Sequence, residues 1–467
     1  MSNSDFANMQ NNSLLFNTGF RVQEKIGLIA QPDRRVGNGE NIRWKRIFDF
    51  RFKIYLQLLS KEMNLFRIFA TTKQKITAKR LHKVNLMAFS AYTIPTIFYL
   101  KSAMKKFLLY LFYPLSSIYG WVTAVRNFFY NVGWCKSKHH SVLVISVGNL
   151  TFGGSGKTPH VAYLVELLSP LFKVAVLSRG YGRSTKGFRE VGSQNTVSEV
   201  GDEPLMYALR YAGVPVAVDE NRNHGIEVLK KKYRDLDVVI LDDAFQHRST
   251  HADLSLLISD YARPFYNDKV FPFGMLREYK RGCKRADIII FSKVPDNITP
   301  LEKRAVLDSV DERVYQEIYF SSIVYADLRS VNNPAQTLPV EQIREAVVVT
   351  GIANPKHLWN YLEKHNIVCH KMAFGDHYCF TSQDIDNIVA QYKKTNTSMK
   401  AIITTEKDAM RLRGNEKLKE IPLFYIPIEI NIHLEKHQRG KDFDKKIIKY
   451  VRENKTNSKF NKSYRLL

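Results

Sequence analysis

A glycine-rich turn separates an apolar, β-branched run from an amphipathic stretch within residues 142–160 (VLVISVGNLTFGGSGKTPH). Glycines allow several backbone N–H groups to converge on one phosphate group, and the positive end of the following helix dipole adds to that attraction. Pro159 would lie in the first helical turn, where the missing N–H of proline costs nothing. The order strand, turn and helix therefore predicts a phosphate-binding loop. We assign nucleotide binding to Thr151, Gly153, Gly154, Ser155, Gly156, Lys157 and Thr158.

The loop departs from the general pattern G-x-x-x-x-G-K-[S/T] at its first position, where Thr151 replaces glycine. The remaining glycines still supply a flexible backbone, so the assignment is retained, with a chance glycine-rich turn as the alternative. Lys157 is expected to reach the β- and γ-phosphates of ATP and to act in catalysis by neutralising their charge. The hydroxyl of Thr158 is expected to bind Mg²⁺.

An acidic pair ends a second apolar run, VVILDDAFQHR, at residues 238–248. In phosphate-loop enzymes such an aspartate binds Mg²⁺ directly or through water. Many strands end in an acidic residue, so this signal gains weight only from the loop upstream. Asp242 and Asp243 therefore join Thr158 as predicted metal ligands, and ATP and Mg²⁺ are the predicted cofactors.

Short apolar runs alternate with helical stretches from residue 141 onward, and this alternation predicts right-handed crossovers and parallel sheets buried on both faces. We expect an α/β fold: a phosphate-loop NTPase-like domain with a parallel sheet, a second, smaller α/β domain, and an N-terminal membrane-associated helix. The predicted strands are 142–147, 173–177, 214–218, 238–241, 254–258 and 288–291 in the first domain, and 346–350, 367–371, 401–405 and 423–428 in the second.

These patterns divide the chain into six parts. Residues 1–103 carry no motif, so either translation begins at Met104 or they form a basic, membrane-leaning extension. The remaining parts are a membrane-anchor helix region (104–140), the phosphate-loop domain (141–325), a hinge or linker (326–344), the smaller domain (345–432), and a C-terminal helix with a basic tail (433–467).

Residues 107–125 (FLLYLFYPLSSIYGWVTAV) contain no charged side chain and just reach the length of a membrane span. Pro114 and three hydroxyl residues interrupt the stretch, and Tyr and Trp, which prefer the interface between head groups and hydrocarbon, recur along it. These features favour an interfacial anchor helix. A spanning helix and a helix packed on the catalytic domain are the two alternatives.

The formal net charge of +25 attracts polyanions, which include nucleic acids, anionic lipids and phosphorylated substrates. Much of the basic excess lies in the first hundred residues and the tail, and the predicted catalytic region lacks the interleaved basic and aromatic residues typical of nucleic-acid binding. We therefore predict that the protein contacts a membrane lipid surface and no nucleic acid. No obligate protein partner is evident from the sequence. The four cysteines form no C-x-x-C pair, which argues against a structural zinc site.

Seven stretches occur in one order: VGNLTFGGSGKTP (147–159), SRGYGR (178–183), GDEP (201–204), LDDAFQH (241–247), GMLRE (274–278), GDH (375–377) and TTEKDA (404–409). This set resembles the tetraacyldisaccharide 4'-kinases, the lipid A 4'-kinases of Gram-negative bacteria, over about residues 105–430. The resemblance implies transfer of the ATP γ-phosphate to the 4'-hydroxyl of a tetraacylated, 1-phosphorylated glucosamine disaccharide. It further implies a peripheral enzyme on the cytoplasmic face of the bacterial inner membrane.

The resemblance also implies roles for individual residues. In the family an aspartate supported by a histidine is the catalytic base, and Asp202 and His377 match those positions. Without the family, an acid at a helix start and an ordinary histidine would be the simpler interpretations. Glu203 is expected to assist the metal. Tentative substrate contacts are Tyr181, Gln246, His247, Arg277 and Glu278, for which packing or a solvated charged face is the alternative.

Two matters stay open at the level of the sequence. The role of residues 405–408 does not follow from their spacing. The rival function is another phosphate-loop ATPase or GTPase that acts as a switch, or a nucleic-acid-associated NTPase. A switch GTPase would need a guanine-reading motif such as N-K-x-D, which we do not find near the loop.

Overall fold

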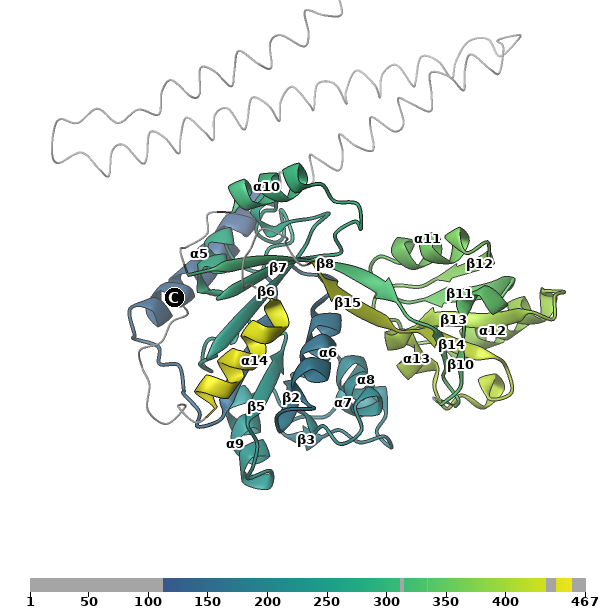
Figure 1. The fold of residues 1–467 in the computed structure, drawn as a ribbon, viewed down its shortest axis with the longest axis horizontal. Coiled ribbons are helices and arrows are strands. Elements are labelled where there is room, and N and C mark those ends of the chain that lie inside the picture. The colour runs from purple at the N-terminus through teal and green to yellow at the C-terminus, as the bar shows by residue number, and fades with distance from the viewer. Residues whose placement is uncertain (1–111, 311–314, 334, 434–441, 456–467) are drawn as a thin grey trace, which may run out of the picture. The chain divides into compact units, whose positions relative to one another are not determined.

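The computed structural model describes residues 112–310, 315–333, 335–433 and 442–455, which belong to one compact unit spanning residues 100–467 (Figure 1). The predicted N-terminal extension, Met104, the first residues of the predicted anchor segment and the basic tail beyond residue 455 lie outside the described residues. The described part contains two sheets with helices on their faces. The prediction of an α/β fold with parallel sheets is confirmed.

Nine strands of the described residues form the first sheet, and we call this sheet with its helices the first lobe. From one edge to the other the strands are β15 (Ile428–Ile432), β8 (Glu317–Tyr325), β7 (Ile288–Ser292), β6 (Leu254–Asp260), β1 (Leu143–Gly148), β5 (Val238–Asp242), β2 (Val174–Ser178), β4 (Val216–Val218) and β3 (Arg189–Glu190). The strands from β8 to β4 are parallel, and the two edge strands are antiparallel to their neighbours. β1 and β5 are buried along their whole length, as a sheet covered on both faces requires.

Helices cover the faces of this sheet (Figure 1). They are α5 (Tyr113–Asn131), α6 (Lys157–Leu168), α7 (Val197–Val200), α8 (Asp202–Arg210), α9 (Arg222–Lys232), α10 (Pro300–Ser309) and α14 (Phe443–Asn454). Two short 3-10 helices, η2 (Phe265–Asn267) and η3 (Lys280–Arg285), lie in the connections. The predicted C-terminal helix corresponds to α14, which returns to the first lobe because Phe443, Ile447 and Val451 are buried in its core.

Six strands of the described residues form the second sheet, which with its helices is the second lobe. Its strands are, in spatial order, β10 (Thr337–Leu338), β9 (Leu328–Ser330), β14 (Leu423–Ile426), β13 (Lys400–Thr405), β11 (Glu345–Thr350) and β12 (Val368–Ala373). β14, β13, β11 and β12 are parallel, whereas β9 and β10 add an antiparallel edge. Its helices are α11 (Lys356–Lys364), α12 (Ser382–Lys394), α13 (Glu406–Leu412), η4 (Val340–Gln342) and η5 (Glu416–Leu418).

The prediction of a single strand at residues 423–428 is wrong. Pro427 divides this apolar run into β14, which stays in the second sheet, and β15, which pairs with β8 of the first sheet. Proline lacks a backbone N–H, so a strand tends to end or change partners at that point. The segment predicted as a hinge or linker (326–344) contains β9, β10 and η4, and β8 extends into the connection as far as Tyr325. The proposed domain boundaries remain predictions.

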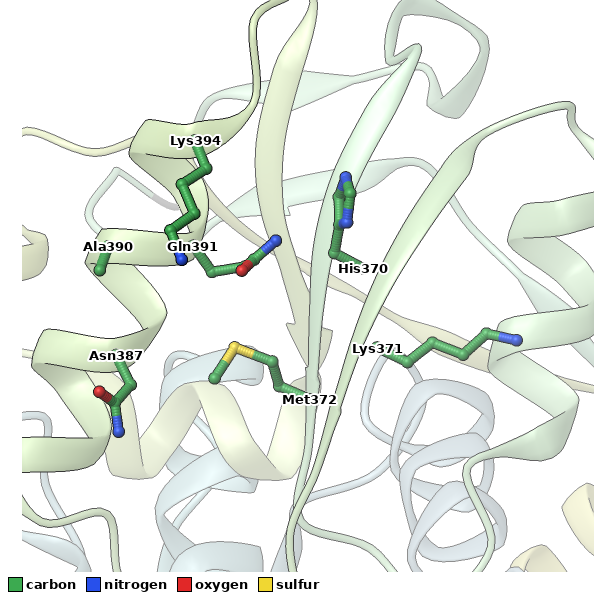
Figure 2. A pocket seen from close by; sticks show the side chains of 7 residues that line it. All are labelled: His370, Lys371, Met372, Asn387, Ala390, Gln391 and Lys394. Atoms are coloured by element: carbon green, nitrogen blue, oxygen red, sulfur yellow. The ribbon is translucent and has the colours of Figure 1, made fainter.

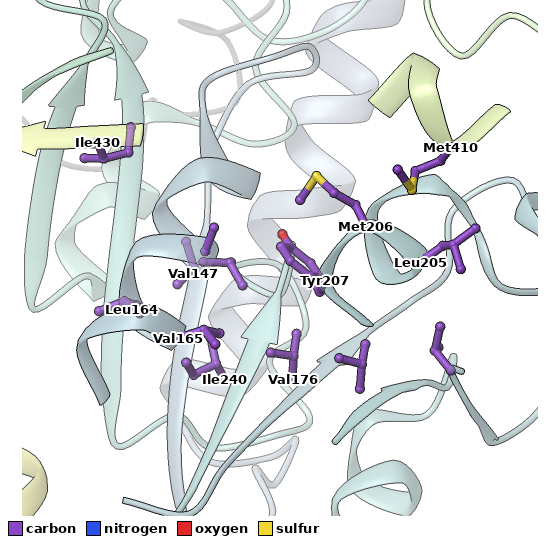
Figure 3. Close-up of a cluster of buried hydrophobic side chains, with 14 of the residues drawn as sticks. Val147, Leu164, Val165, Val176, Leu205, Met206, Tyr207, Ile240, Met410 and Ile430 are labelled. Carbon is purple, nitrogen blue, oxygen red and sulfur yellow. The ribbon is translucent and has the colours of Figure 1, made fainter. Parts of the chain in front are cut away.

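A buried apolar cluster joins the first sheet to α6 and α8 and extends to the second lobe (Figure 3). Strands contribute Val147, Val176 and Ile240, α6 contributes Leu164 and Val165, α8 contributes Leu205, Met206 and Tyr207, and α13 contributes Met410. Because Met410 belongs to the second lobe, the two lobes share buried apolar surface at the contact of α8 with α13.

One side of α5 packs against the first lobe and the other is exposed. The hydroxyl of Ser116 donates to Val270 O at 2.6 Å, and a Cβ at Gly120 would lie 2.6 Å from the hydroxyl of Tyr279. Pro114 lies in the first turn of α5, where proline is tolerated. Apolar side chains that face solvent are Tyr113, Leu115, Ile118, Trp121, Val122 and Phe128. Within the described ranges, we find no helix with the length and apolar character that a membrane crossing requires.

Candidate active site

The glycine-rich turn joins β1 to α6 at the carboxyl edge of the first sheet. Gly156 precedes α6 with a φ of 90°, in the left-handed region that favours glycine. A Cβ at Gly156 would lie 3.0 Å from Ser292 Oγ, whereas a Cβ at Gly153 or Gly154 would meet no described atom within 4 Å. One side of the loop therefore packs against β7, and the other side is open to a ligand.

Replacing Gly156 with alanine should weaken ATP binding by about 10- to 100-fold, because a non-glycine residue in this conformation costs about 1–3 kcal/mol and the loop must distort to relieve it. The matched control is Gly133→Ala, at a residue with a φ of 81° whose Cβ would meet no atom of the described residues within 4 Å. Isothermal titration calorimetry with ATP would measure both. Equal ATP affinity in the two variants would contradict the assignment of the loop.

Side chains behind the loop hold its backbone. The hydroxyl of Ser292 donates to Ser155 O at 2.6 Å. Burial lowers the pKa of His160 to about 4, so its ring is neutral. Its Nδ1 lies 2.7 Å from Gly156 O, a group that can only accept, so Nδ1–H donates and Nε2 accepts from Ser321 Oγ at 3.0 Å. The conformation of the loop is thus fixed by α6, β7 and β8 together.

Lys157 and Asp243 meet at the mouth of the loop. Lys157 Nζ donates to Asp243 Oδ1 at 2.6 Å and to Asn149 Oδ1 at 3.3 Å. Arg277 Nη1 contacts the same carboxylate at 2.9 and 3.0 Å. Burial alone would raise the pKa of Asp243, but Lys157 and Arg277 lower it to about 2, so the carboxylate is ionised. Two cations therefore gather where the phosphates of a nucleotide would lie.

Three of the residues predicted to hold or assist Mg²⁺, namely Thr158, Glu203 and Asp242, lie close to one another. Thr158 Oγ1 donates to Glu203 Oε1 at 2.6 Å. Asp242 is fully buried, and its Oδ1 has no hydrogen-bond partner among the described residues. Burial raises the pKa of Asp242 to about 7, and the charges of Glu203 and Asp243 add to this effect. A divalent cation would provide a partner for Asp242 Oδ1 and would reduce the repulsion between the three carboxylates.

This donor set fits Mg²⁺, because that ion commonly takes one or two carboxylates and completes its shell with phosphate oxygens and water. No group of three or more His, Cys, Asp or Glu side chains in the described part of the chain is arranged to hold a metal ion by itself. The individual ligands therefore remain predictions that depend on the nucleotide.

Asp202 and His377, which are 175 residues apart in the sequence, lie side by side. His377 Nδ1 is 3.0 Å from Asp202 Oδ2, and since a carboxylate only accepts, Nδ1 carries the proton. The guanidinium of Arg411 donates to the same oxygen, and the backbone N–H of Glu203 donates to Asp202 Oδ1 at 2.9 Å. Asp202 begins α8, while His377 and Arg411 come from the second lobe. The pair is thus built across the contact between the lobes.

Burial alone would raise the pKa of Asp202, yet the hydrogen bond from His377 and the charges of Lys407 and Arg411 hold it well below the ordinary aspartate range. The carboxylate is therefore ionised at every pH near neutrality. The hydrogen bond to Asp202 raises the pKa of His377. An ionised carboxylate held beside a phosphate loop can orient a hydroxyl nucleophile and accept its proton.

Comparison with known proteins agrees with this geometry. The family model of tetraacyldisaccharide-1-P 4'-kinases matches residues 108–448. This chain belongs to that family. The tetraacyldisaccharide 4'-kinase of Bacteroides thetaiotaomicron is 40% identical over 360 residues, which cover 74% of this chain and 94% of the relative. That of Cytophaga hutchinsonii is 39% identical over 348 residues, which cover 73% and 97%.

A solved structure of the 4'-kinase family is also similar. The crystal structure of LpxK from Aquifex aeolicus in complex with ATP is 28% identical in sequence and superposes with a TM-score of 0.57. The match covers 74% of this chain and 99% of the Aquifex chain. Residues 108–448 therefore match the sequence of the 4'-kinase family, and the described part of the chain has a fold similar to that of a 4'-kinase.

The tentative substrate residues of this 4'-kinase family member surround the same site. Gln246 Nε2 donates to Asn149 O at 2.8 Å, at the start of the phosphate loop. Tyr181 is 69% exposed, and its ring centroid lies 5.3 Å from that of His377. Burial first, and then nearby arginines, lower the pKa of His247 to about 4. Arg277 pairs with Asp243, as described above. Contact of these residues with substrate remains a prediction.

Glu278 differs from the others because it is buried and fully engaged. It forms a two-pronged ion pair with Arg285, at 3.0 and 2.7 Å, and accepts from Asn127 Nδ2 of α5 at 2.6 Å. Through these contacts Glu278 connects α5 to the segment that carries Arg277. Direct contact with substrate would require this network to open.

Sequence reasoning missed several residues of the 4'-kinase site. Lys407 and Arg411 contact Glu203 and Asp202, yet only the motif TTEKDA drew attention to their segment. His160 and Ser292 support the loop, and no spacing pointed to them.

In the second lobe a cavity of about 450 Å³ opens between β12 and α12 (Figure 2). No predicted site residue lines it; its walls are His370, Lys371, Met372, Asn387, Ala390, Gln391 and Lys394.

Proposed function

We propose that this protein transfers the γ-phosphate of ATP to the 4'-hydroxyl of a tetraacylated, 1-phosphorylated glucosamine disaccharide at a membrane surface. The observation that carries the proposal is a chain of contacts that links the phosphate loop, where ATP would bind, to Asp202, where the sugar hydroxyl would bind. Thr158 of the phosphate loop bonds to Glu203, and the preceding residue of α8 is Asp202, which His377 contacts from the second lobe. A nucleotide on the loop and a hydroxyl on Asp202 would thus be neighbours.

In this proposal the protein supplies charge and position. Lys157 Nζ turns from Asp243 toward the phosphates and neutralises the charge that spreads over them during transfer. Mg²⁺, when bound, would be held by Thr158 and by Asp242 or Asp243, and would supply positive charge that compensates the phosphates during transfer. Asp202 orients the sugar hydroxyl and accepts its proton on a carboxylate oxygen, while Nδ1–H of His377 fixes the orientation of that carboxylate.

The low basicity of Asp202 is compatible with this role. In a loose phosphoryl-transfer transition state the nucleophile forms little bond before the leaving group departs, so the hydroxyl needs orientation more than early deprotonation. A carboxylate that stays ionised meets that need. Tyr181, Gln246, His247 and Arg277 are proposed to contact the disaccharide, and Glu278 to hold Arg277 in place.

The decisive experiment incubates the protein with γ-labelled ATP, Mg²⁺ and the acylated disaccharide 1-phosphate, and locates the new phosphate by NMR. We expect a phosphate monoester at the 4'-position. ATP hydrolysis that is stimulated by RNA or DNA, with no transfer to the disaccharide, would overturn the proposal in favour of a nucleic-acid-associated NTPase.

We further propose that α5 holds the enzyme at the membrane surface, on the cytoplasmic face of the inner membrane. In support, one side of α5 is fixed by Ser116 and Gly120, and the other presents apolar side chains to solvent. The guanidinium groups of Arg126 and Arg248 both lie over the ring of Tyr130 of α5, and their charges would attract anionic head groups. An exposed apolar helix face beside basic residues is typical of interfacial binding.

Ile118→Glu combined with Trp121→Glu should lower binding to vesicles of phosphatidylethanolamine and phosphatidylglycerol by about 100-fold, because each buried side chain contributes about 1.5–3 kcal/mol. Ile118 is 62% and Trp121 66% exposed, so the fold should tolerate both changes. Val368→Glu, at a residue of β12 that is 60% exposed, is the control. Co-sedimentation would measure binding, and an undiminished vesicle affinity of the double variant would rule out α5 as the anchor.

A further inference from the structure

Lys407 brings a cation of the second lobe into the acidic region of the first. It is the second residue of α13, and its Nζ pairs with Glu203 Oε1 of α8. The same oxygen accepts from Thr158 Oγ1 at 2.6 Å. One carboxylate oxygen therefore links the phosphate loop to a lysine that lies about 250 residues further along the chain.

The charge of Lys407 acts on more than one carboxylate. Burial would lower its pKa, but Glu203, Asp202 and Asp242 together raise it, so the group stays an ammonium. These three carboxylates are the proposed base and two proposed supports of the metal. One ammonium compensates them only in part, and Asp242 Oδ1 still has no hydrogen-bond partner among the described residues. Lys407 and a divalent cation would thus compete for the same carboxylates.

Lys407 is held in this place by its helix. Thr405 precedes α13 and caps it, since its Oγ1 accepts from Asp408 N at 3.1 Å. Glu406 pairs with Arg210 of α8 at 3.1 Å, and Met410 is buried in the core that α8 shares. The packing of α13 against α8 therefore fixes the Cα of Lys407 opposite Glu203. From that position its side chain pairs with Glu203 instead of extending into solvent, as a typical surface lysine does.

We propose that Lys407 is a positioning residue for the phosphoryl transfer: it holds Glu203 against Thr158, and it competes with a metal ion for the carboxylates when no nucleotide is bound. The inference rests on the proposed function. Lys407 acts through Glu203 and Asp202, and through it the second lobe sets the charge and geometry of the metal site in the first. Removing its charge frees the carboxylates for a cation and leaves Glu203 without its support.

The test uses Mn²⁺ as a probe, with free Mn²⁺ counted by electron paramagnetic resonance on nucleotide-free protein. Lys407→Met should bind Mn²⁺ about 10-fold more tightly than wild type, because a competing charge beside the site is gone. Its kcat for the disaccharide should fall about 100-fold, the scale for loss of one preorganised polar group, while ATP affinity changes less than about threefold. Lys407→Arg keeps the charge and should restore wild-type Mn²⁺ affinity.

The matched control is Lys417→Met, which removes a lysine of the same lobe from its surface pair with Asp386 at 2.5 Å. Unchanged Mn²⁺ affinity and kcat in Lys407→Met would overturn the inference. Should that variant fail to fold, Lys407→Gln retains a polar chain and decides by the same Mn²⁺ comparison. If wild type transfers no phosphate to the disaccharide, the proposed function fails, whereas the Mn²⁺ measurement still judges the role of Lys407.

Discussion

Lys157→Ala is expected to reduce phosphoryl transfer at least about 1,000-fold. The reason is that the ammonium faces the place where negative charge spreads during transfer, in a site from which water is largely excluded. Lys157 is paired with Asp243 at 2.6 Å, and its side chain is only 10% exposed. The measurement is single-turnover transfer from labelled ATP to the disaccharide.

The fold should survive this change, because Arg277 continues to pair with Asp243 after Lys157 is removed. We expect the free energy of unfolding to fall by no more than about 1 kcal/mol, the upper end for an ion pair with a solvent-accessible partner. Lys232→Ala, which breaks the exposed pair with Glu190 in the same lobe, is the control and should turn over normally. Wild-type turnover by Lys157→Ala would refute the phosphate-loop assignment.

Asp202→Asn should lower kcat by about 10²–10⁴-fold, the usual scale for a general base, and should leave ATP affinity within about threefold. An amide keeps the shape of the side chain but loses the charge that Arg411 and His377 contact. Because those residues act as one unit, adding His377→Ala should cost little beyond Asp202→Asn alone. A loss below about tenfold would reduce Asp202 to a structural residue at the start of α8.

The pH–rate profile gives a second check on Asp202. Its folded pKa is lowered, so the carboxylate loses its charge only at a pH well below the ordinary aspartate value of about 4. The kcat profile should therefore show no acid limb near pH 4 from this group. If an acid limb near pH 4 were present both in wild type and in Asp202→Asn, the group that titrates there, and therefore the base, would be a residue other than Asp202. Asp386→Asn, at a surface pair of the second lobe, controls for loss of a carboxylate.

Local patterns predicted much of the first lobe and less of the rest. Runs such as 142–147 and 238–241 are apolar throughout, since β1 and β5 are covered on both faces, and their type was readily recognised. The run 423–428 looks equally apolar on both sides of Pro427, and nothing local tells which sheet each half joins. That choice depends on β8, a long-range partner about one hundred residues upstream.

The site shows the same limit. The loop residues and Asp242 follow from a motif with a mechanism, because the chemistry requires them near one another in the sequence. Asp202 and His377 came from the family resemblance, and only the fold places them 3.0 Å apart. Lys407 and Arg411 act through partners more than 200 residues away, and a helix with two cations on one face reads locally as a solvated surface.

The exchange of β15 into the first sheet has a practical consequence for anyone who wishes to produce the halves separately. The chain leaves the first sheet after β8 and comes back to it at β15, and α14 then packs on the same core. A fragment cut after Tyr325 would leave β8 as a bare edge strand, and such edges recruit other chains into insoluble assemblies. Truncation at this joint should therefore yield aggregates, and the enzyme is best expressed and engineered whole.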